Sequence, residues 1–219
     1  LVLQNNKGRY KIGNINLSSY SSDSTYTVRM DSKFANGRYS GTAPVTTFVK
    51  DLRDITLKKE LPALFTDSTY VWKGHSYGLD FKFNNSMDLL SFVMPGLYID
   101  EGTSLKASVG NDGHFSAQLS SNRLAFETNY LKGIDARFEN TDDALDGLVT
   151  CSELKISSLR LNDSHLNLHG ADNHVGLKFD YLNDSELVNK GELILHSTLE
   201  RDDDGLGIGV SFLPSSIFL

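Results

Sequence analysis

The sequence has a single cysteine, Cys151, in 219 residues. One cysteine excludes both an intramolecular disulfide and a cysteine-based zinc cluster, so we expect Cys151 to be buried and inert as a small apolar residue. The sequence also lacks any apolar run close to the roughly 20 residues that a membrane-spanning helix needs. What is left is a chain long enough to bury a sizeable hydrophobic core.

Positive charge is scarce as well. The chain has 21 Lys and Arg against 28 Asp and Glu, a formal charge of −7, and its basic residues form no run. This predicts that nucleic acid is not a partner, because phosphate backbones are bound by clustered cations. The same sign argues against adhesion to anionic lipid headgroups, but it does not bear on acyl chains held in an apolar groove.

No secretory signal is recognisable at the start of the sequence. Residues Leu1-Val2-Leu3-Gln4 provide neither a charged segment nor an apolar one followed by a cleavage site. The sequence stops on Ile217, Phe218 and Leu219, which is typical of an interrupted strand. We therefore expect a piece of a longer protein, with targeting information outside it.

Apolar residues alternate with polar ones along most of the chain. Tyr77, Leu79, Phe81 and Phe83 are one example, and such alternation places one side-chain type on each face of a strand. Asn- and Asp-rich turns separate these segments, at 111–113, 162–164, 183–185 and 202–205. Short connections of this kind predict antiparallel neighbours.

One segment departs from the alternation. Between Pro44 and Pro62 the apolar residues recur at nearly helical spacing, which predicts a helix over about 45–60, and a second helical turn is expected at 86–93. The expected fold is mainly β, a long curved antiparallel sheet of the β-taco or open-barrel type with one short amphipathic helix. We divide it into residues 1–95, which carry the helix, and 96–219, which have an apolar inner face.

The residue patterns that could carry chemistry have simpler explanations. Gly74-His75-Ser76-Tyr77-Gly78 has the glycine and serine spacing of a hydrolase nucleophile elbow, but an alternating strand follows it where a helix is required. His165 and His169 lie on the polar side of a predicted strand, and the Asp142-Asp143 and Asp202–Asp204 runs read as solvated turns. We expect no catalytic residue, no metal site and no cofactor.

The apolar strand faces are the remaining candidates for function. If the sheet curls without closing, an uncovered apolar stripe would form a channel suited to acyl chains. The residues expected to line it are Phe115, Leu119, Leu124, Phe126, Ile134, Phe138, Leu154, Ile156, Leu166, Leu168, Val175, Leu177, Phe179, Leu193 and Leu195.

Several motifs, in order, resemble the strand-rich repeats of TamB/AsmA-like proteins of the Bacteroidetes type. They are the segments 94–105, 119–126 and 154–161, the strand start Asp172-Asn173-His174-Val175, the Asn183-Asp184-Ser185 turn and the Lys190-Gly191 step. The resemblance implies a periplasmic, taco-shaped sheet with an apolar interior, tethered by an inner-membrane anchor outside this fragment. It also implies phospholipid transport or outer-membrane protein assembly, with phospholipid acyl chains and outer-membrane assembly proteins as partners.

The leading hypothesis is thus a non-catalytic periplasmic fragment of an envelope-biogenesis protein with an apolar groove. The alternative is a carbohydrate- or protein-binding β-sandwich of a cell-surface protein, in which Trp72 or Tyr98 would belong to the recognition patch.

Overall fold

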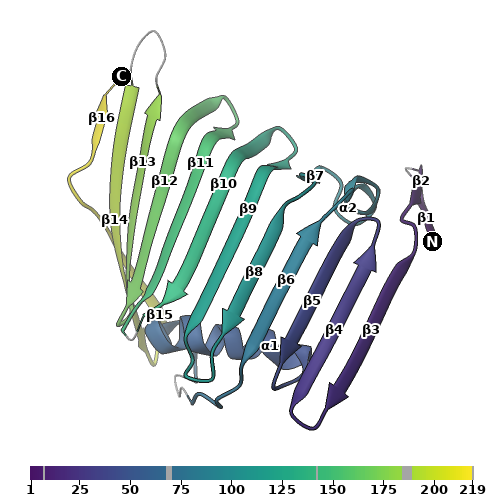
Figure 1. Cartoon of the computed structure of the whole chain (residues 1–219). Helices are drawn as coiled ribbons and strands as arrows, with labels where there is room; N and C mark the ends of the chain where they lie inside the picture. The colour runs from purple at the N-terminus through teal and green to yellow at the C-terminus, as the bar shows by residue number, and fades with distance from the viewer. Residues whose placement is uncertain (7, 68–70, 142, 184–188, 219) are drawn as a thin grey trace.

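The computed structural model describes residues 1–6, 8–67, 71–141, 143–183 and 189–218, and strands dominate it (Figure 1). Fourteen of the strands belong to one antiparallel sheet that does not close on itself. Its order is β15 (Gly205–Phe212), β14 (Asn189–Asp202), β13 (His174–Asn183), β12 (Leu159–Ala171), β11 (Leu145–Ile156), β10 (Asn129–Asn140), β9 (Phe115–Phe126), β8 (Ser104–Val109), β6 (Tyr77–Phe83), β5 (Ala35–Gly41), β4 (Thr25–Ser32) and β3 (Ile15–Ser22), with β16 (Ser216–Phe218) on β14 and β7 (Leu97–Ile99) on β9.

A long helical segment crosses the ends of the strands (Figure 1). It consists of α1 (Val45–Arg53), a π-helical turn η1 (Asp54–Lys58) and a 3₁₀ turn η2 (Pro62–Leu64). Its apolar side packs against one face of the sheet from β5 to β11, and η2 reaches β14, where Arg201 Nε donates to the Ala63 carbonyl at 2.8 Å. The buried core formed in this way contains Tyr39, Ala43, Phe48, Ile55, Tyr77, Val109, Phe115 and Leu145.

A smaller unit lies at the other end of the strands. The hairpin of β1 (Val2–Asn5) and β2 (Gly8–Lys11) contacts α2 (Met87–Val93), and the rings of Tyr10 and Phe92 meet edge to face at 5.7 Å. The helical segment and this unit therefore occupy opposite ends of the sheet (Figure 1).

Four glycines of the sheet lie directly opposite aromatic residues on the neighbouring strand. The pairs are Gly37–Phe81, Gly41–Tyr77, Gly147–Phe138 and Gly191–Tyr181. In each pair a ring atom lies within 2.4–2.7 Å of where a glycine Cβ would be. The rings cover the bare backbone, an arrangement that compensates for the missing side chain in a strand.

The structure confirms the expected fold, a large open antiparallel sheet with a short amphipathic helix. The helix predicted over 45–60 is α1 with η1, and the predicted helical turn at 86–93 is α2. Strand β6 pairs with β8, so the same sheet runs through both predicted segments, 1–95 and 96–219. In the described ranges, no helix is long and apolar enough to cross a membrane.

Candidate functional site: two faces of one sheet

The face of the sheet that contacts α1 is called here the apolar face. Side chains directly opposite each other on neighbouring strands point to the same face. The strand register therefore shows how far the apolar face extends beyond the buried core. Leu119 pairs with Ala136, Ala136 with Val149, Val149 with Leu166, Leu166 with Phe179 and Phe179 with Leu193. One continuous apolar row thus crosses six strands.

Most of the residues predicted to line a groove lie on this apolar face. Phe115 is buried in the core under α1, while Leu193 is 43% exposed at the far side. The rest follow from alternation and register: Leu119, Ile134, Phe138, Leu166, Leu168, Val175, Leu177, Phe179 and Leu195.

The other four predicted groove residues are out of phase with these. Leu124, Phe126, Leu154 and Ile156 are an odd number of residues from Leu119 or Val149 on the same strands. Leu124, Leu131, Leu154 and Leu161 form a second leucine row, and it is separated from the first by a level at which Gly133 and Asp163 have positive φ. A single uninterrupted alternation of apolar and polar residues therefore does not describe β9–β12 along their whole length.

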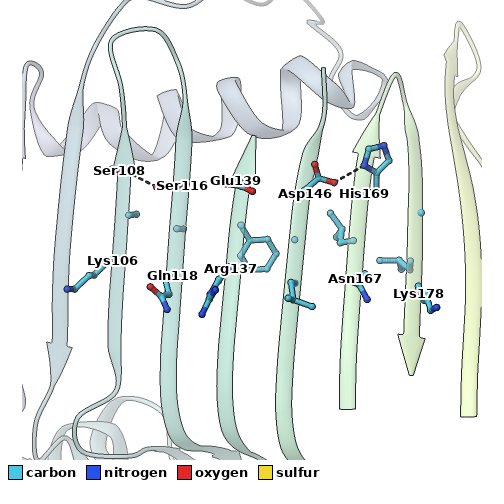
Figure 2. A pocket seen from close by; sticks show the side chains of 18 of the residues that line it. Lys106, Ser108, Ser116, Gln118, Arg137, Glu139, Asp146, Asn167, His169 and Lys178 are labelled. Atoms are coloured by element: carbon cyan, nitrogen blue, oxygen red, sulfur yellow. Dashed lines mark hydrogen bonds and ion pairs between the residues drawn. The ribbon is translucent and has the colours of Figure 1, made fainter. Parts of the chain in front are cut away.

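The opposite face of the sheet is polar. A hollow of about 850 Å³ crosses β8 to β14, and residues of both faces line it. Figure 2 shows two rows of polar side chains among the lining residues. One row contains Lys106, Gln118, Arg137, Asn167 and Lys178, and the other Ser108, Ser116, Glu139, Asp146 and His169. The lining residues that alternate with them, such as Ala107, Ala117 and Phe138, belong to the apolar face.

Several polar and charged side chains of the polar face are paired with one another. Arg137 Nε lies 2.8 Å from Asp135, Lys178 Nζ 2.6 Å from Glu192, and His169 Nδ1 2.7 Å from Asp146. Such exposed pairs contribute little to stability, and they leave the face hydrated. Three of the predicted groove residues, Phe138, Leu168 and Leu177, are among those that line the hollow.

The histidine and acidic motifs lie where the strand pattern placed them. His165 and His169 alternate with Leu166 and Leu168 and face carboxylates, His165 Nδ1 lying 2.9 Å from Asp180. No set of three or more His, Cys, Asp or Glu side chains in the described residues is arranged to hold a metal ion. Cys151 is buried as expected. Asp142, Asp184 and Ser185 lie outside the described residues.

Sequence reasoning missed a polar cluster under α1. His75 Nδ1 lies 2.6 Å from Asp51 Oδ2, and the Tyr77 hydroxyl donates to the same carboxylate. Asp51 is almost fully buried, so these contacts tie α1 to β6. The sequence signal was Asp51 on the apolar side of a predicted helix.

The glycine-serine motif at 74–78 belongs to strand β6 and to the residues just before it. Gly74 has a left-handed backbone conformation, and Gly78 lies within β6.

The polar cluster under α1 predicts acid sensitivity. Burial raises the pKa of Asp51, but hydrogen bonds from His75 and Tyr77 and the charges of His75 and Lys73 outweigh it, so the pKa is lowered overall. A lowered pKa in the folded protein contributes stability above the unfolded value, about 3.9, and that contribution is lost as pH falls through the folded value.

We expect the urea concentration at the unfolding midpoint of the wild type to decrease as the pH is lowered below about 4. Asp51→Asn should make the midpoint less dependent on pH in this range and should lower it at neutral pH. Asp135→Asn, at a half-exposed ion pair, is the control. Profiles of equal slope for wild type and Asp51→Asn would contradict the prediction.

Trp72 and Tyr98, the two residues offered for a recognition patch, lie in different parts of the fold. Trp72 packs against the core under α1 and donates from Nε1 to the Asn111 carbonyl at 2.8 Å. Tyr98 lies on β7 and donates to Asp100 at 2.7 Å.

No protein-family model, curated protein or solved structure matches the chain.

Proposed function

We propose that this chain is a non-catalytic part of an envelope-biogenesis protein of the TamB/AsmA-like type, and that its apolar face accommodates phospholipid acyl chains. The observation that carries the proposal is an apolar row across six strands, Leu119 to Leu193, with no second sheet packed on it in the described ranges. The helical segment covers this face only at one end of the strands (Figure 1).

The row has a suitable length for an acyl chain. Neighbouring strands are about 4.8 Å apart, so six strands span roughly 24 Å. The hydrocarbon core of a bilayer is about 30 Å thick, so an acyl chain in one leaflet spans about half of that thickness. Each methylene removed from water contributes about 0.8 kcal/mol, so a chain laid along the row would gain from most of its length.

The periplasmic location, the inner-membrane anchor and a role in outer-membrane protein assembly belong to the same proposal. They follow from the resemblance of the strand motifs to TamB/AsmA-like proteins. An apolar sheet face left open would serve partly folded outer-membrane strands by the same chemistry, because these too expose alternate apolar side chains.

Lipid extraction tests the proposal. The chain purified from bacterial cells should carry phospholipid detectable by mass spectrometry, and Leu166→Asn with Phe179→Asn should reduce the amount several-fold because both place amides in the row. Asn167→Asp with Lys178→Gln, on the polar face, is the matched control. The proposal fails if no phospholipid is recovered, or if both double variants retain the same amount.

The polar face favours a second candidate, the binding of an extended polar chain such as an oligosaccharide. This face offers amides of Gln118 and Asn167, hydroxyls of Ser108 and Ser116, and the guanidinium of Arg137, on β8, β9, β10 and β12. Glycan-array binding that is lost in Gln118→Ala with Asn167→Ala would favour this function.

A further inference from the structure

The two ends of the sheet differ in charge and polarity. At the end where α1 crosses, the exposed turns that join β8 to β9, β10 to β11, β12 to β13 and β14 to β15 are acidic. Their described carboxylates are Asp112, Asp143, Asp172, Asp202, Asp203 and Asp204.

The opposite end exposes large apolar side chains instead. Met94, after α2, is 51% exposed, Phe126 at the β9–β10 turn 48%, and Ile156 and Leu159 at the β11–β12 turn 54% each. Two hydrogen bonds hold these loops side by side: Glu127 N donates to the Gly96 carbonyl at 2.9 Å, and Ser157 N donates to the side-chain Oδ1 of Asn129 at 2.8 Å. Figure 1 shows the three loops side by side at this end of the sheet, and with their exposed apolar side chains they are called here the tip.

Basic side chains cluster just inside this tip, around Tyr130. The cations of Arg123, Lys132 and Lys155 lie 5.0, 4.9 and 5.8 Å from the centre of its ring. Arg160 belongs to the same group, because its Nε lies 3.1 Å from Glu153 Oε1. With Asp100, Glu101 and Glu127 at the margin, the tip has four basic and four acidic side chains, whereas the whole chain has 21 and 28.

We propose that this tip surface, Met94, Phe126, Ile156 and Leu159 with Arg123, Lys132, Lys155 and Arg160, docks on an anionic phospholipid membrane. The apolar side chains would enter the interface between headgroups and acyl chains, and the basic side chains would contact lipid phosphates. The acidic turns would then face away from the membrane.

The negative charge of the whole chain does not oppose this docking. Strand β9 has 12 residues, which at about 3.3 Å each is roughly 40 Å. Charges in physiological salt are screened beyond about 8 Å, so a membrane at the tip is insulated from the acidic turns. The acidic turns therefore do not repel a membrane at this end of the sheet.

Vesicle flotation tests the proposal. The wild-type chain should float with phosphatidylcholine vesicles that contain phosphatidylglycerol, and less with phosphatidylcholine alone. Lys155→Gln with Arg160→Gln should weaken binding by about 25-fold, roughly five-fold for each cation. Phe126→Ser with Ile156→Ser and Leu159→Ser should weaken binding to both kinds of vesicle.

Val49→Ser with Val71→Ser is the matched control, since both valines are at least 70% exposed but outside the tip. Circular dichroism and urea midpoints establish that each variant folds. Equal binding to both vesicle types, no binding, or equal losses in the tip and control variants would overturn the proposal, as would capture of a soluble protein by the tip that vesicles do not displace. The outcome is independent of lipid co-purified on the apolar face.

Discussion

Replacing Ile55 by alanine is expected to lower the free energy of unfolding by about 2–5 kcal/mol. Ile55 has no exposed surface and lies in η1, where it belongs to the core that joins the helical segment to β5–β11. Because the sheet has no second sheet over it in the described ranges, this core is where its apolar face is most fully covered. Truncation would leave a cavity there that the surrounding strands cannot easily fill.

Urea unfolding measures this effect, and Leu57→Ala provides the control. Leu57 is in the same helical turn but 37% exposed, so its truncation should cost about 1 kcal/mol or less. Equal losses for the two variants would show that the helical segment does not anchor the sheet.

Gly147→Ala is expected to cost about 1–3 kcal/mol although it adds only one methyl group. A Cβ at this position would lie 2.7 Å from the ring of Phe138 and 3.5 Å from Leu168 Cβ. The ring would have to leave its place over the strand, which would disturb the middle of the apolar face.

The control for this prediction is Gly176→Ala, because the nearest atoms to a Cβ there are 3.8 Å away. Both glycines lie in strands of the same sheet, so intrinsic strand preference is similar. A thermal midpoint for Gly147→Ala at or above that of Gly176→Ala would contradict the proposed role of the aromatic rings.

Period-two alternation was sufficient to predict strands such as β6, where apolar Tyr77, Leu79, Phe81 and Phe83 alternate with polar residues, but it gives no signal in β3, whose residues are all exposed. The helix at 45–60 was predictable because its apolar residues change period between two prolines. The strand order could not be read from one sequence, but short turns correctly implied antiparallel neighbours such as β11 and β12.

The limits of the pattern appear at particular residues. Leu124 and Leu154 are an odd number of residues from Leu119 and Val149, so one alternation does not place all four on one face, and the left-handed Gly133 and Asp163 mark the break between the two rows. Phe115 is covered by the helical segment, and only the fold brings Asp51 to His75. Likewise, the scattered basic residues 123, 132, 155 and 160 form a cluster only after four strands are aligned.

The central claim is that the apolar face of this sheet, and not its polar face, holds lipid. A photoreactive amino acid placed at Leu168 or Phe179 in cells should form phospholipid adducts, because both side chains belong to the apolar face. The same probe at the neighbouring Asn167 or Lys178, which point to the polar face, should form none. Adducts at all four positions alike, or at none of them, would contradict the account.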